Sequence, residues 1–234
     1  MTPKCTFTGV DDATPLEALI SLSEAYPGVP EWGVLYSGSN RFGGRYPTPD
    51  RISEIAVLSK ERCQTVRFAL HVCGKAVFDL LAGKGHVSEV VEAFPRIQLN
   101  FVASDINMDA LSDLFSRLKW QTIITQHNSS NAGVWLKLRA RANHAILFDE
   151  SRGCGVMPHV WNGAVPGIVC GYAGGLGPDN LAECLPEIHE AAHGRNHWVD
   201  MESSLRDKND FFDLKKVECC LEIFEHFSQQ QAAA

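Results

Sequence analysis

The 234-residue chain has a formal net charge of −7 at pH 7, with 45% hydrophobic and 21% charged residues. These proportions are typical of a globular protein that is long enough to bury a core without disulfides or metal ions. The chain has no basic run to bind nucleic acid, and no segment approaches the ~20 apolar residues of a membrane span. Its N-terminal segment lacks the apolar stretch of a signal peptide, so we expect a cytoplasmic protein.

Apolar runs of strand length alternate with amphipathic segments of helix length along the whole chain. The predicted strands are Lys4–Val10, Trp32–Tyr36, Val66–Val72, Ile97–Phe101, Thr122–Thr125, Ala145–Phe148, Ile168–Cys170 and Trp198–Met201. The predicted helices are Pro15–Ala25, Pro49–Ser59, Lys75–Leu81, His86–Phe94, Met108–Leu118, Ala132–Arg141, Pro178–Ala191 and Leu214–Phe227. This alternation indicates parallel strands joined by crossover helices. We therefore predict an α/β fold, a (β/α)8 TIM barrel in one domain over residues 1–234, with the QQQAAA tail frayed.

A doubly wound open sheet is the alternative for such an alternation. That fold usually has fewer units and a glycine-rich turn after its first strand. Here the glycine-rich turn, Gly171–Asn180, follows the seventh strand, where barrels often bind phosphate. Thr14 and Thr48 each precede a predicted helix, and we expect their hydroxyls to cap it.

Eight cysteines are spread along the chain without a CxxC pair. In a chain of this length they do not indicate a disulfide framework. Several lie in apolar runs, as Cys170 does, so we interpret most of them as small buried hydrophobes in a reducing compartment. We expect neither a metal ion nor a cofactor.

The residues that follow each strand of a barrel converge on one face and form its site. The candidates at these positions are Thr8 and Asp11 after the first strand, His71 and Cys73 on the third, Asn100 on the fourth, Asp149 after the sixth, Gly174 and Gly175 after the seventh, and Asp200, Ser203 and Ser204 at the eighth. Such a polar collection suits a small-molecule site.

The paired glycines Gly174 and Gly175 form the sharpest motif. They let the backbone approach an anion without an intervening Cβ, and Pro178 suits the first turn of a helix whose amides attract negative charge. The motif predicts a phosphate site that Ser203 and Ser204 complete. The alternatives are a tight turn without a ligand and, for the serines, a helix cap or a solvated turn.

Asp149 directly follows an apolar strand, so we expect its carboxyl group at the barrel mouth. Partial desolvation there would raise its pKa and suit it to general acid catalysis. The alternative is a structural carboxylate bonded to loop amides, for example those of Gly153–Gly155.

His71 and Cys73 lie two residues apart on one strand and therefore share a face. A Cys activated by a neighbouring His is a possible nucleophile or base, and the favoured alternative is a buried His beside a packed thiol. Arg41 and Arg45 lie in a glycine-containing loop, where either guanidinium can bind a carboxylate or remain a solvated charge.

These motifs resemble those of the phosphoribosylanthranilate isomerases. That family consists of (β/α)8 barrels of tryptophan biosynthesis that convert an aminoribose phosphate into an aminodeoxyribulose phosphate by an Amadori rearrangement. The matching positions are Gly174, Gly175, Leu176, Pro178, Asp179 and Asn180 in the seventh-strand motif, Val199, Asp200, Ser203 and Ser204 in the eighth, Asp149 for the sixth-strand acid, Gln98–Leu99 in the fourth and Arg45–Tyr46 in the second loop. The resemblance implies that Asp149 is the general acid and that Arg45 helps to hold the anthranilate moiety.

The chain departs from the family pattern at four places, one of which is the third strand, where the LHVCG segment has no counterpart in the family. Glu202 shifts the eighth-strand motif by one residue, and Asn100 stands where the family has His. The first strand carries Thr8 where the family has its general base, a Cys. An ordinary hydroxyl has too high a pKa to act as a base at neutral pH without an activator. Cys5 lies three residues earlier, so it faces the other side of the strand.

Three functions are compatible with these observations. The first is an isomerase of a phosphorylated sugar derivative, with Asp149 as the acid and Asp11, Cys73 or His71 in place of the missing base. The second is a non-catalytic barrel that binds a small phosphorylated ligand. The third is a lyase or hydrolase that uses His71 and Cys73. In each case we expect a monomer or a homodimer that binds neither nucleic acid nor a membrane.

Overall fold

The computed structural model describes residues 4–38, 44–151 and 154–233. Eight parallel strands form a closed barrel in which each strand pairs with its neighbours in sequence and β8 pairs with β1. The strands are β1 (Cys5–Thr8), β2 (Pro30–Ser37), β3 (Phe68–Cys73), β4 (Arg96–Asn100), β5 (Thr122–His127), β6 (His144–Phe148), β7 (Val169–Ala173) and β8 (His197–Met201). The predicted TIM barrel is confirmed, and the open sheet is wrong.

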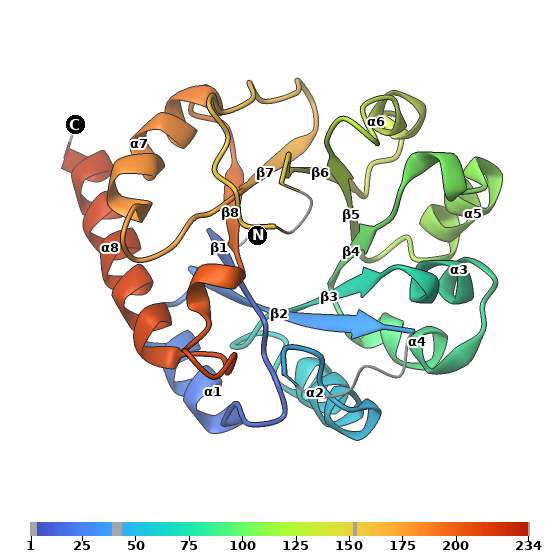
Figure 1. Cartoon of the computed structure of the whole chain (residues 1–234), viewed down its shortest axis with the longest axis horizontal. Helices are drawn as coiled ribbons and strands as arrows, with labels where there is room; N and C mark the ends of the chain where they lie inside the picture. The colour runs from blue at the N-terminus through green and yellow to red at the C-terminus, as the bar shows by residue number, and fades with distance from the viewer. Residues whose placement is uncertain (1–3, 39–43, 152–153, 234) are drawn as a thin grey trace.

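Helices surround the strands on the outside of the barrel (Figure 1). They are α1 (Leu16–Ala25), α2 (Pro49–Glu61), α3 (Lys75–Leu81), α4 (Gly85–Val90), α5 (Met108–Arg117), α6 (Val134–Leu138), α7 (Leu181–Ala191) and α8 (Leu214–Ala233), with 3-10 turns at Val91–Ala93, Ala103–Asp105 and Ser203–Leu205. None of the helices in the described ranges combines the length and the apolar character that a membrane crossing requires.

Several predicted helix ends differ from the structure by one or more residues, and two of them concern features discussed above. α7 begins at Leu181, so Pro178 lies in the preceding turn and not in the first turn of the helix. Asn180 stabilises that turn, because its side chain accepts from the Gly177 amide and donates to the Gly175 carbonyl. At the other end of the chain, α8 continues to Ala233, beyond the predicted end at Phe227 and into the QQQAAA segment that we expect to be frayed.

The two predicted threonine caps have different outcomes. Thr48 caps α2, because its side chain accepts from the Arg51 amide. Thr14 does not cap α1. Its hydroxyl donates to Asp11 Oδ1 and accepts from the Asp11 amide, so it stabilises the β1–α1 loop instead.

Most of the core lies between the outer faces of the strands and the helices. Phe7 and Trp32 are fully buried there, with ring centroids 5.7 Å apart. Cys5 belongs to the same layer, as its odd offset from Thr8 predicts. Burial of apolar side chains in this layer is the main source of stability for such a fold.

The barrel interior is polar at the amino-terminal ends of the strands. Thr6, Glu31, Arg96 and Trp198 lie there, and we call them the floor group. Arg96 Nε lies 3.0 Å from Glu31 Oε2, Thr6 donates to Glu31 Oε1, and the Arg96 guanidinium lies 4.3 Å from the Trp198 ring centroid. Each buried charge in the floor group therefore has an opposite charge beside it.

All eight cysteines are free thiols. Cys5, Cys170, Cys184 and Cys220 are buried, whereas Cys63, Cys154 and Cys219 are exposed and Cys73 is intermediate. The prediction that most cysteines are buried hydrophobes thus holds for only half of them.

Candidate functional site

A cavity of about 570 Å³ lies at the carboxyl-terminal ends of the strands. Ten of the twelve site residues predicted from the sequence line it: Arg45, His71, Cys73, Asn100, Asp149, Gly174, Gly175, Asp200, Ser203 and Ser204. The convergence follows from the barrel, which brings the ends of distant strands to one opening. Thr8 and Asp11 are not among the lining residues.

Thr8 is buried beside Asp200, outside the cavity lining. Its hydroxyl donates to Asp200 Oδ1 at 2.9 Å. Gly33 makes room for it, because a Cβ at position 33 would lie 2.4 Å from Thr8 Oγ1. The structure therefore gives Thr8 the role of orienting a neighbouring carboxylate.

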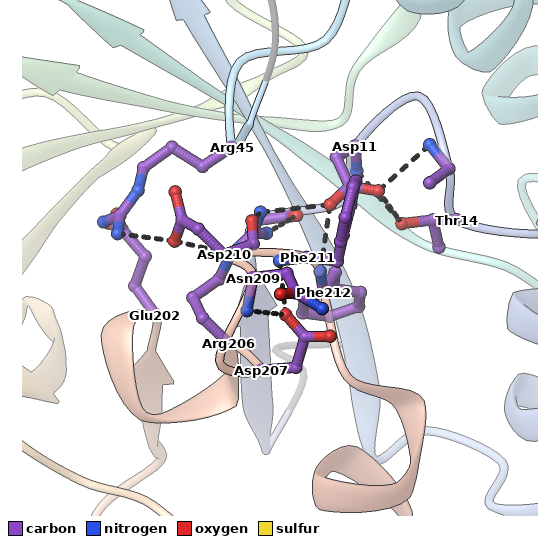
Figure 2. Close-up of polar contacts among 12 residues, drawn as sticks. Asp11, Thr14, Arg45, Glu202, Arg206, Asp207, Asn209, Asp210, Phe211 and Phe212 are labelled. Atoms are coloured by element: carbon purple, nitrogen blue, oxygen red, sulfur yellow. Dashed lines mark hydrogen bonds and ion pairs between the residues drawn. The ribbon is translucent and has the colours of Figure 1, made fainter.

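Asp11 links two loops (Figure 2), and it is not among the residues that line the cavity. Its Oδ2 accepts from Arg206 Nη2 at 3.0 Å and from the Phe212 amide at 2.9 Å. Its Oδ1 accepts from the Thr14 hydroxyl and the Ala13 amide. With both oxygens occupied and the side chain buried, Asp11 stabilises the loops around it, and these contacts do not support its candidate role as a base.

Three buried polar atoms around the cavity have no hydrogen-bond partner among the described residues. They are Asp200 Oδ2, His71 Nε2 and Gln98 Oε1, and we call these three residues the mouth group. His71 Nε2 lies 3.9 Å from Asp200 Oδ2, which is too far for a direct hydrogen bond. Leaving a buried polar atom unpartnered costs about 1–3 kcal/mol, so the mouth group is arranged to be completed by a ligand or water.

Burial shifts the titration of the mouth group toward neutral forms. It raises the pKa of Asp200 well above its usual value, although the Thr8 hydrogen bond acts in the opposite direction. It also lowers the pKa of His71 to about 3, with the Arg96 charge contributing. His71 is therefore a neutral imidazole at pH 7, able to accept or donate a hydrogen bond according to its tautomer.

The Cys73 thiol is packed and protonated. Burial raises its pKa to about 12, and its sulfur accepts from Asn100 Nδ2 at 3.3 Å and donates to the His71 backbone carbonyl. The His71 ring nitrogen Nε2 lies near Asp200. These contacts fit the favoured alternative of a buried His and a packed thiol, and they do not support a Cys73 nucleophile.

Asp149 lies at the end of β6 with an exposed fraction of only 4%. Its Oδ2 accepts from Gln126 Nε2 at 3.1 Å, and its Oδ1 accepts from the Ser151 hydroxyl at 2.7 Å. The amides of Gly153–Gly155 are the alternative partners expected for Asp149. Gly153 lies outside the described residues, and the Cys154 amide donates to the Ser151 carbonyl instead. Side chains therefore orient this carboxyl group within the cavity wall.

Arg45 binds carboxylates of the chain itself (Figure 2). Its Nη1 lies 2.7 Å from Glu202 Oε1, and its Nη2 lies 3.1 Å from Asp210 Oδ1. Burial raises the pKa of Glu202, and the bond to Arg45 opposes that shift. Arg41, the other predicted arginine, lies outside the described residues.

The glycine turn after β7 packs against the loop that follows β6. Gly174 and Gly175 have φ angles of +127° and +63°. A Cβ at these positions would lie 2.7 Å from the Val156 carbonyl oxygen and 2.8 Å from that of Gly155. Backbone conformation and loop packing thus require glycine here, with or without a bound anion.

Amide groups at the same rim are available as hydrogen-bond donors. Within the part of the chain that the structure describes, the backbone amides of Gly174, Gly175, Ser203 and Ser204 donate no backbone hydrogen bond. The Ser204 hydroxyl donates to the Leu176 carbonyl, so it stabilises the turn. Amides of this kind, gathered at strand ends, are suited to binding an anion.

Gln126 and Glu202 also lie at the ends of predicted strands, and both line the cavity. Sequence reasoning assigned no site role to Gln98, Leu35 and Leu147, which line it too. Strand alternation predicts a site position for Gln98, because Gln98 lies two residues before Asn100 and its side chain therefore faces the same side of the strand. Among residues 4–38, 44–151 and 154–233, no three His, Cys, Asp or Glu side chains are grouped to hold a metal ion.

No family model matches the chain, and no curated protein matches it. Solved phosphoribosylanthranilate isomerase structures match it over nearly their whole length. TrpF from Jonesia denitrificans is 18% identical, with a TM-score of 0.63 over 97% of this chain and 98% of that one. The Thermus thermophilus enzyme is 14% identical, with a TM-score of 0.59 over 96% of this chain and 99% of that one. Monomers generated from the dimeric Thermotoga maritima enzyme are also 14% identical, with a TM-score of 0.58 over 95% of this chain and 98% of that one. The resemblance predicted from the sequence motifs is thus confirmed as a shared fold.

Proposed function

We propose that this protein isomerises a phosphorylated ribosylamine by an Amadori rearrangement. The observation that carries the proposal is the mouth group, which lines the same cavity as Asp149 and whose three buried atoms lack hydrogen-bond partners within residues 4–38, 44–151 and 154–233. A sugar hydroxyl both donates and accepts hydrogen bonds, so adjacent hydroxyls can satisfy a carboxylate, an amide oxygen and an imidazole together. The amides of Gly174, Gly175, Ser203 and Ser204 would hold the phosphate.

The proposed chemistry needs one acid and one base. Asp149 donates a proton to the ring oxygen while the C1–O bond breaks and the nitrogen lone pair forms a C1=N bond. A base then removes the proton from C2, and the C–H electron pair forms the C1=C2 bond of an enolamine. Protonation at C1 together with loss of the proton from the C2 hydroxyl gives the 2-ketone, so the product is an isomer and no external oxidant or reductant is required.

We assign the base to Asp200, which replaces the cysteine of the resembling family. Burial raises its pKa, so fewer Asp200 side chains are ionised at neutral pH, but each ionised carboxylate is a stronger base than an exposed one. Thr8 holds Oδ1, so Oδ2 remains available toward the cavity, with the neutral His71 ring beside it. This assignment gives Thr8 a positioning role in place of proton transfer.

The test is a turnover assay with ribosylamine 5-phosphates formed from ribose 5-phosphate and aromatic amines. The ketone product is followed by NMR and mass spectrometry. We expect conversion by the native protein and a loss of at least about 100-fold in Asp149→Asn. Asp113→Asn, an exposed position on α5, is the matched control and should keep the native rate. No conversion at high protein concentration, or an unchanged rate in Asp149→Asn, would refute the proposal.

A second function, binding without turnover, is favoured by the Thr8 substitution. In that case the phosphorylated sugar binds and is not converted. A Thr8→Cys variant separates the two functions. A gain of turnover in an otherwise inactive protein would mean that the native chain is a binding protein on an intact scaffold.

A further inference from the structure

Charge is distributed unevenly around the cavity. Asp149, Asp200 and Glu202 line it, and Arg45 is the one Arg or Lys among its described lining residues. Both terminal nitrogens of Arg45 are engaged, one by Glu202 and the other by Asp210. A ligand carboxylate on this side of the cavity would therefore meet Glu202 and no free cation.

Glu202 is held in place by a chain of alternating charges that Figure 2 displays. Glu202 pairs with Arg45 at 2.7 Å, Arg45 with Asp210 at 3.1 Å, Asp210 with Arg206 at 3.3 Å, and Arg206 with Asp11 at 3.0 Å. The last pair is buried, with side-chain exposures of 4% and 2%. The chain therefore connects the Glu202 carboxylate, through Arg45 and the partly exposed Asp210, to the buried Arg206–Asp11 pair, and Arg45 orients Glu202 before any ligand binds.

Glu202 and the amide rim face different sides of the barrel mouth. The Glu202 side chain reaches Arg45 in the loop after β2, whereas the Ser203 side chain lies against Gly155 in the loop after β6. β2 is separated from β7 by β1 and β8 around the closed barrel. A ligand with its phosphate at the amides of Gly174 and Gly175 would thus direct its other end across the mouth group toward Glu202.

We propose that Glu202 recognises the group attached to the sugar nitrogen and selects a cationic or hydrogen-bond-donating group over a carboxylate. This inference rests on the proposed function, since it names the substrate class of that same site. Its physical basis is electrostatic: a carboxylate at Glu202 adds a like charge in a partly desolvated site, and an ammonium group there gains an ion pair. The unpartnered, buried atoms of the mouth group support a ligand in this cavity independently of Glu202.

The experiment compares three non-reacting analogues, reduced 1-arylamino-1-deoxyribitol 5-phosphates. Their rings carry a 2-carboxylate, no substituent, or a 2-aminomethyl group, and binding is measured by isothermal titration calorimetry. We expect the native protein to bind the aminomethyl analogue at least about 10-fold more tightly than the carboxylate analogue. In Glu202→Gln this ratio should fall to about one or invert, because Arg45 is then released to bind the carboxylate. Glu222→Gln removes the same charge from an exposed position on α8 and should keep the native ratio.

A second variant changes the ratio in the opposite direction. Arg45→Gln leaves Glu202 without its cation, so it should increase the preference for the aminomethyl analogue; this partly exposed position keeps the test valid if Glu202→Gln does not fold. Binding of all three analogues with a native preference for the carboxylate would overturn the inference and leave the proposed function standing. Failure of all three to bind would overturn both.

Discussion

The two ends of the barrel interior differ in whether their buried charged groups contact a partner of opposite charge. In the floor group, Glu31 and Arg96 lie 3.0 Å apart and the guanidinium packs on Trp198. In the mouth group, Asp200 and His71 remain 3.9 Å apart and Gln98 Oε1 has no partner among the described residues. The same strands supply both ends, since β8 carries Trp198 and Asp200. Opposite charges are in contact at one end of the barrel, whereas at the other end the buried Asp200 Oδ2, His71 Nε2 and Gln98 Oε1 lack hydrogen-bond partners among the described residues.

The largest effect on stability is expected in the floor group. Arg96→Met leaves Glu31 buried without its cation, so we expect a loss of about 3–5 kcal/mol in the free energy of unfolding. Guanidinium denaturation measures this loss. The double variant Glu31→Gln/Arg96→Met should recover much of it, because no uncompensated charge remains. A single variant as stable as the native protein would mean that the pair does not stabilise the floor.

Asp200→Asn should separate function from stability at the mouth. The amide keeps the shape and still accepts from Thr8, so the free energy of unfolding should stay the same or rise as a buried carboxyl is removed. Turnover of the ribosylamine phosphate should fall by about 100-fold or more, because the proton acceptor is lost. Intact turnover together with a large loss of stability would make Asp200 a structural residue.

Gly171→Ala tests how tightly Trp198 fills the floor. A Cβ at position 171 would lie 2.3 Å from the Trp198 ring, and such overpacking costs about 1–3 kcal/mol. Thermal unfolding measures the loss. Gly133→Ala is the matched control, since its Cβ meets no atom within 4 Å. Equal stability of the two variants would show that the ring moves aside without cost.

His144, at the amino-terminal end of β6, gives a smaller effect that depends on pH. Burial lowers its pKa to about 4, and its ring shares a 2.9 Å hydrogen bond with the Thr125 hydroxyl. Between about pH 6.5 and 4, His144 is protonated in the unfolded chain but remains neutral in the folded protein. Its contribution to stability is therefore present at neutral pH and is lost as the pH falls. We expect His144→Gln to be about 1 kcal/mol less stable than the native protein at pH 7.5.

Guanidinium denaturation of the native protein and of His144→Gln at pH 7.5 and at about pH 5 checks this expectation. The difference should shrink or reverse by pH 5, because the glutamine does not titrate. A difference that stays constant over this range would mean that His144 takes up a proton as readily in the folded state as in the unfolded one.

The fold could be predicted from the sequence because strand-length and helix-length patterns alternate with a regular period. Strand ends then identified most of the cavity, including Asp149 and Asp200. The partners of each side chain could not be predicted in this way. Asp11 follows β1 as a site residue would, yet Arg206 from the far end of the chain engages it. Only the folded chain brings such pairs together, and the same holds for the thiol of Cys73 and for Arg45 with Glu202.

On our proposal, a phosphorylated sugar supplies the hydrogen-bond partners that the mouth group lacks. The most direct test is a thermal-shift titration of the native protein with phosphate, ribose 5-phosphate and the unsubstituted phenyl analogue at equal concentrations. A ligand that binds only the folded state raises the midpoint according to RT ln(1 + [L]/Kd). We predict the largest shift for the analogue, a smaller one for ribose 5-phosphate and the smallest for phosphate. No shift with any of the three would contradict the claim and would leave the likeness to the isomerases as one of fold alone.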